Sequence, residues 1–139
     1  MADPYRGFNF KVEIDGITEA AFRECTGLDA STDPVEYRDG TDPNHVRQLT
    51  GLNKYSPITL IRGITDSPSL WQWRQKVIDG KTERKSVSIV LYNEAQEEKL
   101  RWNLRKAWPS KWTGPSFNAT SNDVAIETLE IVHEELVKA

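Results

Sequence analysis

The stretch RWNLRKAWPSKWTGP, Arg101–Pro115, carries the pattern that decides the fold class of this 139-residue chain. In its first half Trp102 and Leu104 alternate with polar residues, as apolar side chains do on one face of a β-strand. The segment 94–108 is also rich in helix formers, so periodicity alone leaves helix and strand open there. The choice therefore depends on the segments around it.

Strand-like alternation is clearest near the N-terminus, where apolar residues alternate with polar ones: Phe8, Phe10, Val12 and Ile14 against Asn9, Lys11, Glu13 and Asp15. Such a period of two predicts a half-buried strand. Asp15-Gly16 is a strong hairpin signal, so a second strand is expected to follow and to end near Gly27. Cys25, the only cysteine, is expected on this strand as a small buried residue.

Three more segments bear on the fold. Residues 57–62 and 85–93 each predict a strand, the latter with Val87, Ile89 and Leu91 on one face. Residues 124–136 also alternate, but a strand there is apolar on both faces. Helix and strand therefore stay equally open for that segment.

Residues 67–79 predict a helix. Ser67 suits the N-cap, Pro68 the first helical position and Gly80 the C-terminal cap. Trp71 and Trp73 lie about 200° apart around such a helix. One of them is therefore expected to face the core and the other to pack against something lateral.

Residues 29–56 are unusual because turn formers separate two short extended stretches, 35–38 and 45–49. The segment is too long for an ordinary loop of a compact domain, and such loops are usually functional or ordered by a partner. We interpret 29–56 as an arm. A surface insertion without function is the alternative.

Composition excludes several classes of function. The net charge is −3 and no Lys/Arg run occurs, which argues against a module that grips nucleic-acid phosphates. The first ten residues lack the basic and apolar regions of a Sec signal and no apolar run approaches roughly 18 residues, so neither a Sec signal nor a membrane segment is expected. Five tryptophans are a surplus in a chain that is only 37% hydrophobic. Some of them are therefore expected to serve contacts between subunits.

The sequence has no pattern typical of catalysis or of cofactor binding. His45 and His133 stand in separate segments, so no zinc ligand set is formed. Neither a phosphate-binding glycine motif nor a nucleophile elbow occurs. We expect no enzyme, no catalytic residue, no metal and no cofactor. A structural assembly subunit is favoured, and a carbohydrate-binding β-module with Trp102, Trp108 and Trp112 as platforms is the alternative from another class.

Seven blocks carry a resemblance to a known family. In order they are DPYRGFNFKVEIDGI, TGLD, VEYRDG, LTGLNKYSPITLIRGIT, LWQWR, RWNLRKAWPSKWTGP and NDVAIETLEIVHEEL. Together they resemble the tail tube proteins of contractile phages and of phage-tail-like contractile injection systems. The resemblance covers nearly the whole chain.

The resemblance implies a single tail-tube domain over 1–139 that is mainly β, a small two-sheet sandwich or barrel flanked by one helix at 67–79. It makes 99–108 a strand paired with 86–93, and 124–136 the last strand. It also implies assembly into hexameric rings that stack into a hollow tube, which a contracting sheath drives through a membrane. A tube-initiating baseplate subunit of the same machine is the alternative within this class.

The resemblance further implies the partners: other copies of the chain, sheath, baseplate and spike proteins, tape-measure or terminator proteins, and DNA or protein cargo in the lumen. Assembly is expected in the bacterial cytoplasm, as part of a virion tail or injection particle. Expected contacts between subunits or rings are Tyr37, Arg38, Arg47, Leu49, Trp71 and Trp112. Trp108 is expected to close the sandwich. Candidates for the lumen are Asn9, Lys11, Glu13, Ser86 and Ser88.

Overall fold

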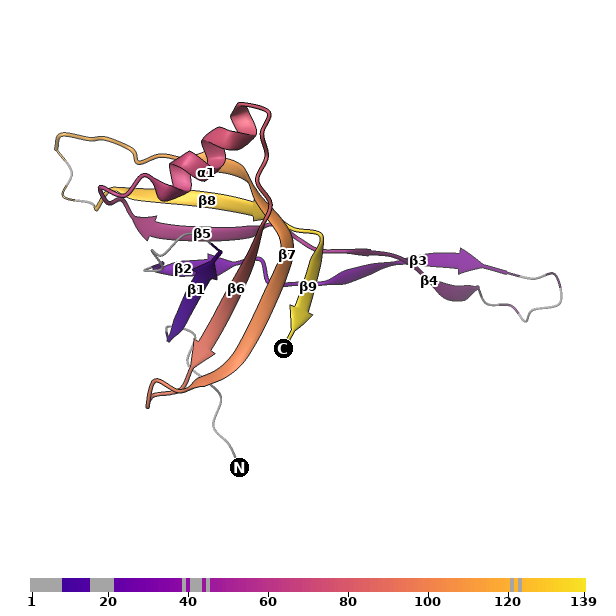
Figure 1. Cartoon of the computed structure of the whole chain (residues 1–139). Coiled ribbons are helices and arrows are strands. Elements are labelled where there is room, and N and C mark those ends of the chain that lie inside the picture. The colour runs from indigo at the N-terminus through magenta and orange to yellow at the C-terminus, as the bar shows by residue number, and fades with distance from the viewer. Residues whose placement is uncertain are drawn as a thin grey trace.

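A computed structural model describes residues 9–15, 22–38, 40, 44, 46–120, 122 and 124–139. This part of the chain forms nine β-strands and one α-helix (Figure 1). In chain order they are β1 (Phe10–Ile14), β2 (Glu24–Thr26), β3 (Ser31–Tyr37), β4 (Arg47–Lys54), β5 (Ile58–Gly63), α1 (Ser69–Ile78), β6 (Lys85–Tyr92), β7 (Glu98–Thr113), β8 (Ile126–Val132) and β9 (Glu135–Lys138). The fold is thus mainly β with one helix, as expected.

Strand β7 is 16 residues long and belongs to two sheets. Its first half pairs with β6 and β9, and its second half pairs with β8. We call β1, β6, β9 and the first half of β7 the first sheet, and β8, β5, β2 and the second half of β7 the second sheet. The strand path begins at β1 and ends at β2, which do not pair. The two sheets therefore form an open sandwich and not a closed barrel.

The bend in β7 has a local cause. The pairing skips one residue of β7 opposite Ser86, where Lys106 has a positive φ of 53°. A second register shift falls between Pro109 and Lys111. Extra residues of this kind bend a strand and increase its twist. They allow one continuous strand to leave the first sheet and enter the second.

The segments left open by periodicity are both strands. Residues 98–113 form β7 and pair with β6, which confirms the pairing implied by the resemblance. The segment 124–136 is mainly strand, but it breaks near His133 into β8 and β9, so β8 is not the last strand. Glu127, Leu129 and Ile131 of β8 point inward and are buried.

The expected hairpin at Asp15-Gly16 is wrong. Strand β1 pairs with β6 in the first sheet, and β2 pairs with β5 in the second. The turn signal describes only local backbone preference, whereas the partner is chosen by which apolar faces can share a core. Phe8 and Gly16 lie outside the described residues.

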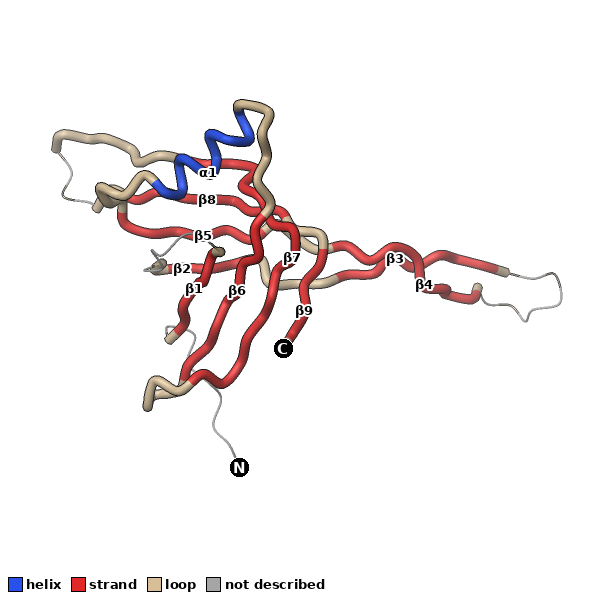
Figure 2. The backbone as a smooth tube through the Cα atoms, viewed as in Figure 1, coloured by secondary structure: helices blue, strands red, loops and turns tan. Residues whose placement is uncertain are grey.

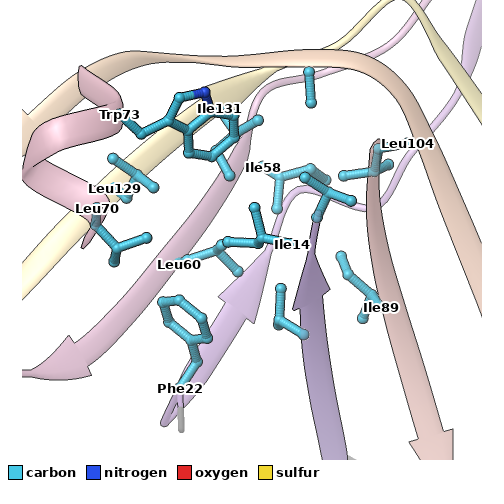
Figure 3. Close-up of a cluster of buried hydrophobic side chains, with 13 residues drawn as sticks. Ile14, Phe22, Ile58, Leu60, Leu70, Trp73, Ile89, Leu104, Leu129 and Ile131 are labelled. Carbon is cyan, nitrogen blue, oxygen red and sulfur yellow. The ribbon is translucent and has the colours of Figure 1, made fainter. Parts of the chain in front are cut away.

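The core lies between the sheets and beneath the helix (Figure 3). Leu70 and Trp73 enter it from α1, and both are almost fully buried. Each such side chain contributes about 1.5–3 kcal/mol when it leaves water. Trp73 also donates from Nε1 to the Glu83 carbonyl over 2.7 Å. Trp71 stays partly exposed, so the expectation that only one of the two tryptophans faces the core is confirmed.

The helix begins two residues later than expected. Pro68 occupies the N-cap position, and no side chain caps this end. The C-terminal end of α1 is capped by Gly80, as predicted, and this glycine has a φ of 77°. The Gly80 N–H donates to the Val77 carbonyl, and the Lys81 N–H donates to the Lys76 carbonyl. This pair of bonds is the Schellman arrangement.

Within residues 29–56, β3 and β4 form an antiparallel pair that projects from the body. Strands β3 and β4 pair only with each other among the described strands (Figure 2). The segment is therefore more regular than two extended stretches joined by turns. We call β3 and β4 the arm. His45 lies outside the described residues.

Two glycines with positive φ allow a matched test of the backbone. A Cβ at Gly27 would lie 2.2 Å from the Pro57 carbonyl oxygen, whereas a Cβ at Gly80 would meet nothing within 4 Å. Gly80→Ala should therefore lower the free energy of unfolding by about 1 kcal/mol through strain alone. Gly27→Ala should lower it by about 3 kcal/mol or more, because a steric clash is added. Urea unfolding of both variants measures the difference, and equal losses would contradict the close packing at Gly27.

Candidate assembly surfaces

One face of the arm carries a cluster of exposed apolar side chains, and Leu52, at the bulge in β4, is exposed as well. Val35 lies opposite Leu49, and Tyr37 lies opposite Arg47, so these four side chains share a face. Val35, Tyr37 and Leu49 are 49%, 47% and 48% exposed. The opposite face carries Pro34, Glu36, Gln48 and Thr50. A two-stranded hairpin alone is only marginally stable in water, so an exposed apolar face on it points to a binding partner.

The root of the arm is fixed to the body by polar contacts. The Ser56 N–H donates to Asp29 Oδ1 over 3.2 Å, which ties the end of the arm to its start. His133 Nε2 lies 3.2 Å from the Ser56 carbonyl oxygen, and its ring packs against Tyr55 with centroids 5.6 Å apart. We call Asp29, Ser56, Tyr55 and His133 the root clamp. It fixes the direction in which the arm leaves the body.

The outer face of the first sheet is polar. Lys11 and Glu13 of β1 share this face with Ser88 of β6 and with Arg101 and Asn103 of β7. Ser88 Oγ donates to Asn103 Oδ1 over 2.7 Å. We call this the polar face. Charged, amide and hydroxyl groups dominate this face, and the half-buried Val137 of β9 lies among them opposite Asn103.

Charges of both signs meet on the polar face. Arg101 bridges two carboxylates, with Nη1 2.9 Å from Glu13 and Nη2 2.6 Å from Glu98. The hydrogen bond from Arg101 holds the pKa of Glu98 below its usual range, and the two carboxylates raise the pKa of Arg101. Farther along β7, Arg105 pairs with Glu135 of β9. Since these groups are in contact with water, they determine the charge of the surface more than the stability of the fold.

One apolar residue of the first sheet is hidden beneath this surface. Val90 is in register with Lys11 on one side and Arg101 on the other, and it is fully buried. Long charged side chains cover apolar surface with their methylene groups while their heads stay in water. The polar face therefore has no exposed aliphatic side chain at this position.

A third surface is formed where α1 meets β7. Trp71 and Trp112 contact each other edge to face, with ring centroids 4.9 Å apart. Trp112 is half-buried against the core, and its Nε1 donates to Glu127 Oε2 over 3.1 Å. Glu127 forms a buried ion pair with Arg62. Within one copy, Trp112 therefore donates a hydrogen bond to the buried Glu127 carboxylate and packs against Trp71.

The expected site residues fall into separate groups. Tyr37, Arg47 and Leu49 come together on the arm, and Arg38 follows β3 and is exposed. Trp71 and Trp112 lie on the body. Their contacts with other copies stay predictions.

The lumen candidates share two neighbouring strands. Lys11, Glu13, Ser86 and Ser88 are exposed or half-exposed on β1 and β6. Asn9 instead lies at the end of the sheet, where its side-chain amide donates to the Tyr92 and Asn93 carbonyls. Their place at a lumen stays a prediction.

Sequence reasoning missed the residues that complete these surfaces. Arg101, Asn103 and Arg105 stand on the polar face, and Val35 stands on the arm beside Leu49. Once the segment of β7 is taken as a strand, its alternation indicates which of its residues lie on the polar face. Trp108 is half-buried at the point where β7 joins β8, opposite Val132.

Within the described part of the chain, no group of three or more His, Cys, Asp or Glu side chains is placed to hold a metal ion. None of the helical segments in those residues has the length and hydropathy needed to cross a bilayer.

The two tryptophans of the body allow a paired test. Trp112→Phe keeps an aromatic ring but removes the donor to Glu127, so the free energy of unfolding should fall by about 1–2 kcal/mol. Trp71→Phe should change it by less than about 0.5 kcal/mol, because the ring rests on the surface. Urea unfolding of the two variants measures both effects. Equal changes would mean that the Trp112–Glu127 bond contributes nothing to stability.

Known proteins match both the sequence and the fold. A sequence profile described as "T4-like virus tail tube protein gp19" matches residues 6–137. None of the curated proteins compared with the sequence matches it.

Three solved structures illustrate the likeness. A chain of the PVC sheath–tube complex, an extracellular contractile injection system in its extended state, has a TM-score of 0.87 and 31% identity, over 98% of this chain and 91% of that one. A chain of the anti-feeding prophage (AFP) tube-terminating cap has a TM-score of 0.88 and 30% identity, over 100% and 93%. A chain of the AFP baseplate has a TM-score of 0.85 and 25% identity, over 100% and 97%.

The profile covers nearly the whole chain, and the matched folds include the arm, the helix and both sheets over almost their full length. The chain therefore belongs to the T4-like virus tail tube protein gp19 family, whose members are structural tube proteins.

Proposed function

We propose that this chain is the subunit of the inner tube of a contractile phage tail or contractile injection system, and that six copies form a ring. The observation that carries the proposal is the first sheet, whose strand order is β1-β6-β7-β9 and whose two outer strands have no further partner among the described strands. An open edge is a template for pairing with another chain. If β9 of one copy pairs with β1 of the next, the contact is head-to-tail and closes into a ring when the rotation permits.

Ring closure turns the first sheets into one continuous barrel around a lumen. The core covers the apolar side of each first sheet, so its polar face is the side available to line the channel. Lys11, Glu13, Arg101 and Arg105 give that lining charges of both signs. A mixed, wet surface lets DNA or protein cargo slide without binding tightly.

Stacking of rings needs a second interface, and the arm supplies it. The arm exposes the apolar side chains of Val35, Tyr37 and Leu49. Its two strands pair with no other strand of the described chain. Arg38 and Arg47 add positive charge at the arm's far end. Ordering the arm costs roughly 1–2 kcal/mol per residue, and a ring already in place offsets part of this when it buries the apolar face.

The family and its neighbours suggest the other partners. Structures with similar chains are described as a sheath–tube complex, a tube-terminating cap and a baseplate. We infer that this tube meets a sheath protein, a terminator and baseplate or spike proteins, with a tape-measure protein and cargo inside. Assembly takes place in the bacterial cytoplasm. The subunit acts as a rigid conduit and catalyses no reaction.

A tube-initiating baseplate subunit is the second candidate. The match to a chain of the AFP baseplate, at 25% identity, favours it specifically. The main-tube proposal is preferred because the sheath–tube and cap chains are more similar, at 31% and 30% identity. The carbohydrate-binding alternative finds no support, because Trp112 packs on Trp71 while Trp102 lies on the first sheet.

Electron microscopy of the purified protein across concentration and salt tests the proposal. We expect hexameric rings and hollow tubes of uniform width. Leu49→Asp should leave rings intact and abolish tubes, because a charge on the arm's apolar face cannot be buried without a partner. Gln48→Asp, one residue away on the opposite face, should still form tubes.

Circular dichroism melting of both variants provides the control for folding. Since Leu49 and Gln48 lie outside the core, the melting temperature of the body should match that of the parent protein. Particles that stay monomeric at high concentration would overturn the tube proposal. Tubes formed equally well by Leu49→Asp would remove the arm from the stacking interface.

A further inference from the structure

Arg101 lies on the polar face between two carboxylates that come from different strands. Its Nε and Nη2 donate to the two oxygens of Glu98 over 3.3 and 2.6 Å, and its Nη1 donates to Glu13 over 2.9 Å. Nε, Nη1 and Nη2 are therefore all engaged within one copy. Arginine binds the oxygens of a phosphate with the same paired donors.

The side chain of Arg101 lies along the sheet. Glu13 belongs to β1 and Arg101 to β7, so β6 lies between them, with Val90 buried beneath the pair. Since neighbouring strands are about 4.8 Å apart, the two side chains together span about 10 Å. Arg101 is 27% exposed, whereas the side chain of Arg105 on the same face is 61% exposed. The ion pairs therefore keep the Arg101 guanidinium from projecting into solvent.

The other cations of the polar face also have partners in their own copy. Lys11 Nζ lies 5.2 Å from the centre of the Tyr92 ring, and Arg105 Nη1 lies 3.4 Å from Glu135. The positive and negative charges of these contacts balance, Lys11, Arg101 and Arg105 against Glu13, Glu98 and Glu135. Arg101 differs from the other two cations because two carboxylates hold it.

The two carboxylates compete with any phosphate that approaches Arg101. They belong to the same chain as the guanidinium, so their effective concentration beside it is high whatever the concentration of DNA. A phosphate has to displace at least one of them, and the displaced carboxylate then repels it. Exposed ion pairs contribute little to the stability of a fold. Their main effect here is on what Arg101 can bind.

We propose that Arg101 is a latent site for the phosphates of DNA, and that Glu13 and Glu98 keep this site closed. The inference rests on the proposed tube function, in which the polar face lines the lumen. It names the residues that prevent DNA from being retained there. In a closed ring every copy contributes the same closed site to the channel wall, so passing DNA meets an arginine that is already paired.

Tubes in which the two carboxylates become amides test the proposal. Glu13→Gln with Glu98→Gln removes the competing charges and keeps the size of both side chains. The probe is a fluorescein-labelled oligothymidylate, and its binding to purified tubes is measured by fluorescence anisotropy over a range of salt concentrations. The double variant should bind the probe about tenfold more tightly than parent tubes, and its affinity should fall as salt rises.

Two further variants serve as matched controls. Adding Arg101→Gln to the double variant should return the affinity to that of parent tubes. Asp79→Asn with Glu83→Gln removes the same charge at the end of α1 and in the loop after it, where Glu83 pairs with Lys76 and Lys85. This control should bind the probe no more tightly than the parent. Circular dichroism melting checks that every variant folds.

The outcomes separate this inference from the proposed function. Tubes that form normally but show no gain in the double variant would overturn the closed site and leave the tube function in place. An equal gain in the Asp79–Glu83 control, or a gain that survives Arg101→Gln, would also overturn it, because general loss of negative charge would then explain the binding. If the parent protein forms neither rings nor tubes, the proposed function fails and the closed site falls with it.

A second probe reports on which side of the tube the site lies. The same oligonucleotide is tethered to beads that are wider than the tube, so that it cannot enter the lumen. Tethered DNA should not bind the double variant. If it binds as tightly as the free probe, the polar face points outward, and both its place in the lumen and the inference are wrong.

Discussion

Everything else in the structure depends on one strand that serves two sheets. The bulges of β7 at Lys106 and Ser110 turn its direction while its backbone hydrogen bonds pass from β6 and β9 to β8. The two sheets are thereby joined by covalent bonds as well as by packing. Their separation is then filled by one core, which includes Leu104, Leu129 and Trp73.

The same geometry leaves two strand edges unpaired and puts an apolar surface next to them. Because the path stops at β1 and β2, the sandwich stays open along one side, and that side holds both a pairing edge and an apolar groove. Closure within one chain would have hidden both. Between β5 and β8 of the second sheet, Glu127 and Arg62 form a buried ion pair, and Trp112 donates a hydrogen bond to Glu127. A buried pair of this type is poor evidence of stability, but removing one member is strongly unfavourable.

Sequence reasoning recovered most elements and misjudged how some of them connect. Alternation located β1, β5 and β6, and capping residues located α1, because each signal is local. The strands β7 and β8 needed the family resemblance, since buried strands and helices have similar apolar content. The β1–β2 hairpin failed because pairing is decided by distant residues. The root clamp combines residues from separate elements, Asp29 with Ser56 and His133, and no periodicity reports such contacts.

The root clamp also makes the arm a lever. Seven residues of β3 reach about 23 Å at strand spacing. A rotation of roughly 10° at the root would then move the tip by about 4 Å, a full contact distance between side chains. The three hydrogen-bonded groups at Asp29, Ser56 and His133 therefore control, from inside the body, where the far end of the arm arrives. In a stacked tube, a small rotation at the root clamp would therefore change the twist between one ring and the next.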